Sequence, residues 1–449
     1  MNNHMPKKPI AIDYDFTNMT AGRTGSADER ARELPRLQAE ADSARRALVE
    51  RFRAGQVGFM TMPERTGAIR AAREMAKAVS AKFRTLIVIG IGGSDLGARA
   101  LLGALKPVGK AMDVRFIGAN TDPEEIATLL REIDWRRTAL NVISKSGDTI
   151  EPMSVFLLLR DRLIKAVGAK RHRLHVIATT DDKSGTMRQI ADREGYRTLP
   201  VPRDIGGRFS ALTPVGLFPA ACAGIDVGKL ISGAHDVLED FLSAAPEKNG
   251  SLTFAALQVA AYRRGQPLTV FMPYAESLRQ FAFWFRQLWA ESLGKKTSRR
   301  GQTVHAGFTP VAALGATDQH SQIQLYNEGP ADKTLTFIEV KKFRDDAAVP
   351  KPYPDIEGVA YMAGHKFSEL IHAERKATAI ALTKNGVPNG TISIPSVSGE
   401  SVGGLMMFFM LATAVAAELL DVDAYDQPGV EAGKRAMYAL LGRGGYLLD

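Results

Sequence analysis

Leu140-Asn-Val-Ile-Ser-Lys-Ser-Gly-Asp-Thr-Ile-Glu-Pro152 is the segment around which the rest of this chain is arranged. Residues 139–143 are mostly apolar, which predicts a buried strand. The hydroxyl-rich turn that follows contains Gly147, where the backbone can approach a ligand closely. Pro152 suits the first position of a helix because its missing N–H would be unbonded there. The free amides and positive dipole end of that helix predict an anion in the turn.

The side chains of this turn favour phosphate as the anion. Three of them carry hydroxyl donors and one carries a positive charge: Ser144, Ser146, Thr149 and Lys145. The same residue types are common in ordinary strand-to-helix turns, so this segment alone leaves both interpretations open.

The totals describe a soluble, multidomain protein. A chain of 449 residues is too long for one core and should divide into two or three domains, and 45% hydrophobic with 24% charged residues is ordinary for a globular protein. The one cysteine, Cys222, excludes an intramolecular disulfide and favours a reducing compartment. We therefore expect a cytoplasmic protein in which Cys222 is a buried thiol of a small apolar helix.

Neither a membrane nor a nucleic acid is an expected partner. Lys7 and Lys8 have no apolar run behind them, and Val402–Ala417 is shorter than the roughly 20 residues that span a bilayer. That segment predicts a core or subunit-interface helix. The net charge is +9, and Lys295–Arg300 is the densest basic patch, but it lacks interleaved aromatics and suggests a solvated loop. A basic chain also attracts small anionic substrates.

A second glycine turn precedes the opening segment. Residues 85–89 predict a strand, Gly93 and Ser94 belong to the glycine-rich turn after it, and a helix follows through Leu105. Asp95 stands where a dinucleotide fingerprint needs glycine, and the Gly-Lys-Ser/Thr of a P-loop is absent. The turn therefore predicts a site for one sugar or phosphate.

Further strands at 114–118, 139–143 and 173–178 predict one parallel sheet with both turns at its carboxyl edge, where open parallel sheets bind ligands. His172 and His175 resemble a metal pair, but three residues apart on a strand they would lie on opposite faces. A third turn, Gly206-Gly-Arg208, places an arginine just before a helix, where it is suited to an anion. The helical segments 26–53 and 64–82 should pack around this first domain.

A second α/β pattern begins near Gly250. Residues 268–272 predict a strand, and Ala275–Leu293 predicts a helix with a continuous apolar stripe. Glu291 lies off that stripe in the last turn, where the dipole disfavours a negative charge and makes the carboxylate a better proton acceptor. His320 should occupy the first turn of another helix, where the dipole favours neutral imidazole, although a capping histidine without a role is the plain alternative.

The ordered motifs resemble the glucose-6-phosphate isomerase family in its shorter bacterial form. The matching segments are Gly90–Gly97, Ser144–Thr149, Gly206–Ser210, Ala290–Lys295, Gly315–Gln322 and Gln427–Glu431 with Lys434.

The resemblance implies an α/β fold of two sugar-isomerase (SIS) domains, each a mostly parallel sheet flanked by helices, with helical extensions at both ends. The expected segments are an N-terminal extension (1–60), first and second SIS domains (61–225 and 226–424) and a C-terminal helical segment (425–449). It also implies a homodimer that uses neither metal nor cofactor. The histidines form no HExxH or carboxylate–histidine cluster, which agrees with the absence of a metal.

Residue by residue, the resemblance assigns phosphate and sugar binding to Gly93, Ser94, Ser144, Lys145, Ser146, Thr149 and Gln427. Arg208 would stabilise the intermediate, and Glu291 would move the proton. His320, from the neighbouring subunit, and Lys434 would help to open the sugar ring.

Two places depart from the family pattern. Asp148 stands where many relatives have threonine, which leaves the direction of its carboxylate open, and the conformation of residues 296–307 is also open. Two other functions are compatible with the same phosphate turn. One is a related isomerase that acts on another sugar phosphate, such as mannose 6-phosphate, and the other is a sugar-phosphate sensor without catalysis.

Overall fold

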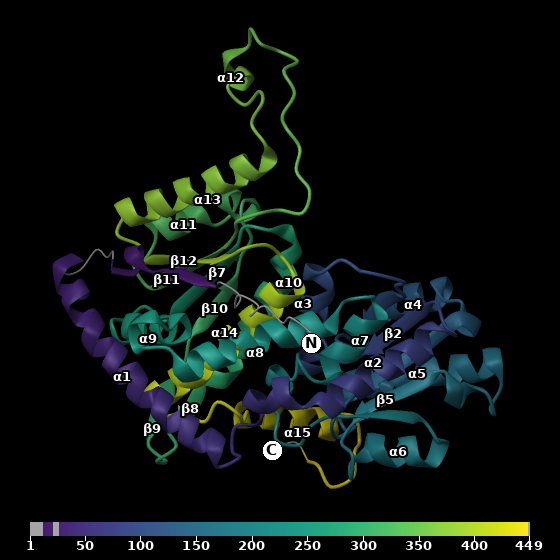
Figure 1. The fold of residues 1–449 in the computed structure, drawn as a ribbon. Coiled ribbons are helices and arrows are strands. Elements are labelled where there is room, and N and C mark those ends of the chain that lie inside the picture. The colour runs from purple at the N-terminus through teal and green to yellow at the C-terminus, as the bar shows by residue number, and fades with distance from the viewer. Residues whose placement is uncertain (1–11, 21–26, 448–449) are drawn as a thin grey trace, which may run out of the picture.

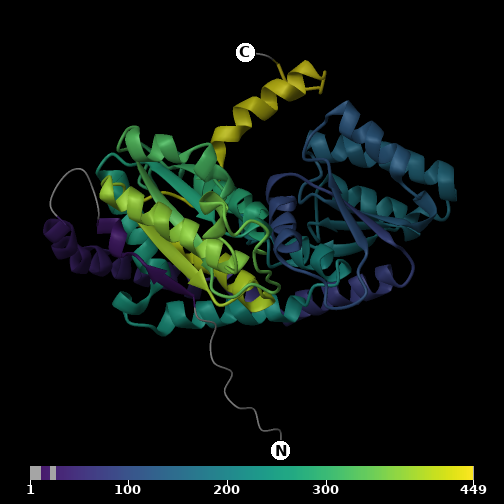
Figure 2. The same cartoon turned by 90° about the horizontal axis from the view of Figure 1, so that it is seen from above.

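The protein has two α/β lobes, seen side by side in a computed structural model that describes residues 12–20 and 27–447 (Figures 1 and 2). The C-terminal helix α15 (Glu431–Leu440) lies outside both lobes, beside the gap between them in Figure 2. Each lobe is built on one sheet, and the two sheets share no strand.

The first lobe contains the parallel sheet that the sequence predicts. Its strand order is β3-β2-β4-β5-β6, and all neighbouring strands run parallel. Each central strand is buried along its length because helices cover both faces, which explains its continuous apolar run. The strands are β2 (Thr85–Ile89), β3 (Asp113–Ile117), β4 (Thr138–Ile143), β5 (Val176–Thr180) and β6 (Arg197–Pro200). The helices are α2 (Thr66–Ser80), α3 (Leu96–Ala104), α4 (Pro123–Glu132), α5 (Ile150–Val167), α6 (Thr186–Glu194) and α7 (Pro214–Cys222).

The second lobe has a sheet of order β1-β12-β11-β7-β10, in which only the edge strand β1 is antiparallel. The strands are β1 (Asp13–Asp15), β7 (Leu268–Pro273), β10 (Thr309–Ala312), β11 (Lys333–Val340) and β12 (Asn389–Ile394). The helices are α8 (Val227–Ser243), α9 (Gly250–Arg263), α10 (Arg279–Leu293), α11 (Ile323–Glu328), α13 (Phe367–Lys384) and α14 (Gly399–Leu419). The apolar stripe expected along α10 is buried, and Gly294 ends that helix.

The prediction that the first long helix packs around the first domain is wrong. Helix α1 (Ala27–Arg53) lies against the second lobe, where Arg51 pairs with Glu418 at 2.7 Å and Glu40 with Arg263 at 2.6 Å. Strand β1 extends the second sheet beside β12. An amphipathic pattern shows that a helix packs on something, but it does not identify the surface, because any apolar groove can accept its stripe. Helix α2, by contrast, packs on α7 in the first lobe as expected.

Helix α14 is the core helix of the second lobe. It is the one described helix long and apolar enough to cross a membrane, but 89% of its most apolar window is buried inside the protein. Gly403 allows close contact with α8, since a Cβ there would lie 1.9 Å from the Leu230 carbonyl oxygen. The expectation of a buried core helix is confirmed. Cys222 is also buried, at the end of α7, and burial raises the pKa of its thiol.

Two further local predictions are wrong or only partly right. The basic segment expected as a solvated loop is exposed over most of its length, but it belongs to a hairpin of β8 (Lys295–Thr297) and β9 (Thr303–Ala306), in which Lys295 is buried and Arg299 pairs with Glu418. His172 lies in a 3₁₀ turn before β5, not on the strand, and its imidazole contacts the Tyr196 hydroxyl at 3.1 Å. In both places charged or polar residues satisfy internal partners, which composition alone does not reveal.

We expect Gly403→Ala to lower the free energy of unfolding by about 1–3 kcal/mol, because α8 and α14 would have to separate to admit the methyl group. Gly67→Ala is the matched control, since a Cβ at that position in α2 meets nothing within 4 Å. It should leave stability unchanged or slightly higher. Urea unfolding of both variants measures the difference, and equal stabilities would contradict the packing described.

Candidate active site

The two phosphate-binding candidates lie next to each other at the carboxyl edge of the first sheet. Strands β2 and β4 are parallel neighbours with Ile89 opposite Val142, so the turns that follow them emerge side by side. The chain order of the strands reverses between β2 and β4, which makes this position the switch point where open parallel sheets bind ligands. The juxtaposition that the sequence predicts is confirmed.

The turn after β4 is shaped by its own hydroxyl groups. Ser144 Oγ accepts a hydrogen bond from the Gly147 amide at 2.9 Å, and Ser146 Oγ accepts one from the Asp148 amide at 3.2 Å. Gly147 has φ 80°, and a Cβ there would lie 2.2 Å from the Met187 nitrogen, so only glycine fits. Lys145 Nζ donates to the Arg203 carbonyl at 2.8 Å.

Thr149 stands at the N-cap of α5, which begins at Ile150. Pro152 is therefore the third residue of the helix and not the first, as the sequence suggested. Its missing N–H still costs nothing there, because the first four amides of a helix have no partner within it.

The glycine turn after β2 packs directly on the arginine turn. A Cβ on Gly93 would lie 2.1 Å from the carbonyl carbon of Gly207, so the two backbones meet in a way that requires glycine. Ser94 ends the 3₁₀ turn in this segment. Arg208, in the 3₁₀ turn Gly207–Phe209, is thereby fixed next to the switch point.

Arg208 is the buried centre of the site, with a side chain only 2% exposed. Its guanidinium donates to Ser292 Oγ at 2.8 Å, to Gln427 Oε1 at 3.0 Å and to the Asp426 carbonyl at 2.8 Å, and also to the Ala424 carbonyl. Burial lowers the pKa of Arg208, while Glu291 acts in the opposite direction. A buried guanidinium with this many acceptors is a fixed positive charge.

Glu291 faces that charge. Its Oε1 lies 3.6 Å from Arg208 Nη1, and its side chain remains 28% exposed. The other carboxylate oxygen accepts from Gln287 Nε2 at 3.0 Å. Arg208 and Gln287 therefore orient the Glu291 carboxylate from two sides, and its exposed part remains accessible to a ligand.

Two residues that support Glu291, Gln287 and Lys295, were not recognised as site residues in the sequence. Gln287 holds Glu291 from one helical turn earlier, and Gly92 of the glycine turn approaches it, since a Cβ there would lie 3.0 Å from Gln287 Nε2. Buried Lys295 donates to the Glu291 and Ser292 carbonyls at 2.8 and 3.0 Å and so caps α10. The spacing of four residues from Glu291 was a signal for Gln287, because residues four apart on a helix are neighbours. Lys295 follows Gly294, beyond the end of the helix, so this spacing gave no signal for it.

His320 lies away from Glu291 in the same chain. It ends the 3₁₀ turn Thr317–His320 before α11, so the predicted place in the first turn of an α-helix is wrong. The Gly315 amide, just before the His320 turn, donates to the Pro273 carbonyl at 3.0 Å, and Pro273 lies a few residues before Arg279, the first residue of α10, so the His320 turn is near that end. Glu291 is at the other end of α10, roughly 18 Å along its axis at 1.5 Å per residue. His320 is exposed.

The C-terminal segment is only partly in the site. Gln427 contacts Arg208, as stated above, whereas Lys434 Nζ pairs with Glu431 of its own helix at 2.8 Å. The Tyr438 hydroxyl in the same helix donates to the Asp148 carbonyl at 3.0 Å. Helix α15 therefore contacts the turn after β4, residues 144–149, which is called the phosphate turn after its expected ligand. Lys434 makes no contact with Arg208 or Glu291 among the described residues.

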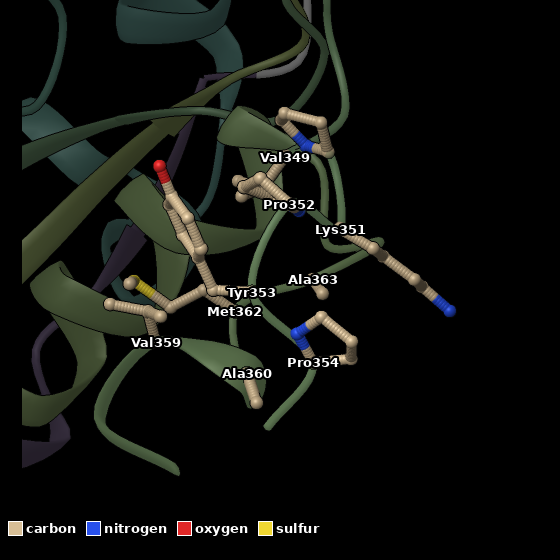
Figure 3. Close-up of a pocket in the computed structure, with 10 residues that line it drawn as sticks. Val349, Lys351, Pro352, Tyr353, Pro354, Val359, Ala360, Met362 and Ala363 are labelled. Carbon is tan, nitrogen blue, oxygen red and sulfur yellow. The ribbon is translucent and has the colours of Figure 1, made fainter. Parts of the chain in front are cut away.

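A well-formed cavity lies outside this region. It has a volume of about 440 Å³ and is lined by Val349, Tyr353, Met362 and their neighbours (Figure 3). All of these belong to residues 345–366, here called the arm, which projects from the second lobe beyond α13 (Figure 1). None of the predicted site residues lines it. Within the described residues, no group of three or more His, Cys, Asp or Glu could hold a metal ion.

Comparison with known proteins identifies the family of the chain. The family model described as phosphoglucose isomerase matches residues 60–442. The glucose-6-phosphate isomerase of Carboxydothermus hydrogenoformans is 41% identical over 97% of this chain and 96% of its own length. That of Thermus thermophilus is 40% identical over 88% of this chain and 92% of its own length.

Solved structures share the whole fold. A structure from Thermus thermophilus, titled a hypothetical protein, superposes with a TM-score of 0.86 at 37% identity and covers 96% of this chain and 100% of that one. A glucose-6-phosphate isomerase from Chlamydia trachomatis gives 0.81 at 24% identity, covering 96% of this chain and 88% of that one.

The two mostly parallel sheets with their flanking helices, together with these relatives, place the protein among the sugar-phosphate isomerases of the two-lobed α/β class. The chain belongs to the phosphoglucose isomerase family.

We expect Arg208→Lys to lower the free energy of unfolding by about 2–4 kcal/mol, because an ammonium group cannot reach all the oxygens that the buried guanidinium satisfies. Arg115→Lys is a control, since Arg115 forms pairs with Asp113 and Glu132 that are about one third to one half exposed, and such pairs contribute little. Thermal and urea unfolding measure both. A loss for Arg208→Lys no larger than for the control would contradict the network.

Proposed function

We propose that this protein interconverts glucose 6-phosphate and fructose 6-phosphate by proton transfer within the sugar, in glycolysis and gluconeogenesis. The observation that supports this best is the Arg208–Glu291 pair at 3.6 Å, beside two anion-binding turns. Family membership and curated relatives at about 40% identity support the same reaction.

Aldose–ketose exchange moves a proton between C2 and C1 through an enediolate. One carboxylate is enough if both carbons lie within about one hydrogen-bond length of it. Glu291 takes this role, since its carboxylate is held by Gln287 and partly open. The negative oxygen that develops needs a fixed positive partner, and such a donor is typically worth about 3 kcal/mol. Arg208 supplies it without the cost of reorganisation, because its partners already hold it in place.

The other roles are those that the resemblance to the isomerase family implies. The phosphate binds in the turns that contain Gly93, Ser94, Ser144, Lys145, Ser146 and Thr149. Gln427, which is bonded to Arg208, contacts the sugar. Lys434 assists ring opening from α15. In this proposal the reaction needs no metal and no cofactor.

We also propose that the enzyme is a homodimer in which each active site receives His320 from the partner. The position of His320 supports this, because its turn lies near the first residue of α10 whereas Glu291 lies in the last turn, roughly 18 Å further along the helix axis. The arm exposes apolar side chains that a second copy would cover: Tyr353 is 58%, Ile356 50% and Tyr361 71% exposed. The domain boundaries given above and a cytoplasmic location belong to the same proposal.

We expect Glu291→Gln to lower kcat by about three or more orders of magnitude while KM changes little, because the amide fills the same space but cannot accept the proton. Glu276→Gln, an exposed residue just before α10, is the control and should retain wild-type kcat. An isomerase assay from fructose 6-phosphate measures both. Turnover of Glu291→Gln close to that of the wild type would remove Glu291 from this role.

Mixing two inactive variants tests the shared site. Glu291→Gln and His320→Ala dimers, unfolded and refolded together, should regain about a quarter of wild-type activity, because half of the dimers are mixed and each has one intact site. Each variant refolded alone is the control. If the mixture stays as inactive as its components while mixed dimers are detected by mass, each site is built from one chain.

A further inference from the structure

Helix α15 is attached to the protein in an unusual way. None of its residues is buried, although it carries Lys434. In the described part of the chain, one hydrogen bond joins this helix to the lobes, from the Tyr438 hydroxyl to the Asp148 carbonyl at 3.0 Å. Arg443, just after the helix, lies 3.9 Å from the Asp148 carboxylate. Both contacts reach the same residue of the phosphate turn.

The partners on the α15 side support one another. The Arg443 guanidinium lies 4.5 Å from the ring centre of Tyr438 and 5.4 Å from that of Tyr446, and the two rings are 5.0 Å apart, edge to face. A cation over aromatic faces is favourable, so Arg443 and Tyr438 are presented to Asp148 as a unit.

Asp148 also has hydrogen-bond partners in the first lobe. Its Oδ1 accepts from Thr186 Oγ1 at 2.9 Å, and its amide donates to Ser146 Oγ. The carboxylate that departs from the family pattern therefore has Thr186 and Arg443 as partners, which gives it a role other than contact with the phosphate.

We propose that Asp148, Tyr438 and Arg443 are positioning residues that join α15 to the phosphate turn and so set the place of Lys434. This inference rests on the proposed function, in which Lys434 assists ring opening. A phosphate bound to the amides of the turn orders the backbone that bears the Asp148 carbonyl. Phosphate binding and the docking of α15 therefore stabilise each other, and this coupling is reciprocal.

The test uses Tyr438→Phe in the full-length protein, with Tyr446→Phe as the matched control that removes a neighbouring hydroxyl but no bond to Asp148. Tyr438→Phe should lower kcat about 3- to 10-fold, the factor that one ordinary hydrogen bond supplies, with a smaller change in KM. Its Tm should stay close to the wild-type value, because no residue of α15 is fully buried. Wild-type kcat in Tyr438→Phe would overturn the proposal.

A second readout does not require activity. Inorganic phosphate should slow tryptic cleavage after Lys434 several-fold in the wild type and in Tyr446→Phe, and have no such effect in Tyr438→Phe. Equal protection in all three proteins would overturn the coupling. If the wild type lacks isomerase activity but phosphate still protects α15, the proposed function fails while the attachment stands.

Discussion

The burial of the Arg208 guanidinium is the constraint on which the arrangement of the site depends. An arginine that is 2% exposed must have its charge and its N–H groups satisfied, or the fold loses several kcal/mol. The acceptors come from the last turn of α10 and from the segment 424–427, while the arginine itself comes from a turn of the first lobe. Satisfying one side chain therefore brings three distant segments together.

The two lobes contribute different parts to the chemistry. The first sheet ends in two turns whose amides and hydroxyls suit a phosphate, and the second lobe supplies α10, which holds Glu291 on its last turn. A negative charge there is unfavourable with respect to the helix dipole, but the nearby Arg208 and the capping Lys295 compensate it. Burial lowers the pKa of Lys295, as does the positive charge of Arg208, while Asp426, whose carboxylate lies 3.5 Å from the Lys295 ammonium, acts in the opposite direction.

Much of this was predictable because it is local in sequence. Apolar runs that end in glycine-rich turns determined the strands β2 and β4, and parallel neighbours necessarily place such turns together. Glu291 was recognised because a negative charge in the last turn of a helix is unfavourable with respect to the helix dipole. The contacts of Arg208 could not be predicted in this way, because its acceptors at 424–427 lie more than 200 residues away in the chain.

The predictions that failed have a common cause. A sequence pattern identifies a helix or a strand, but it does not identify the residues that pack against that element. Helix α1 was recognised as a helix, but its packing on the second lobe depends on which apolar groove the rest of the fold leaves uncovered. Lys295 was assigned to a solvated loop because its partners are backbone carbonyls, which no composition reveals. His320 was placed in an α-helix, whereas the chain forms a 3₁₀ turn first.

The most direct measurement is a crystal structure of the protein with fructose 6-phosphate bound. The account predicts the phosphate in the turns after β2 and β4, with a Glu291 carboxylate oxygen about 3 Å from both C1 and C2 and the Arg208 guanidinium beside the O1–O2 edge of the sugar. A sugar phosphate bound elsewhere, or one in these turns with its C1 and C2 beyond the reach of Glu291, would contradict it.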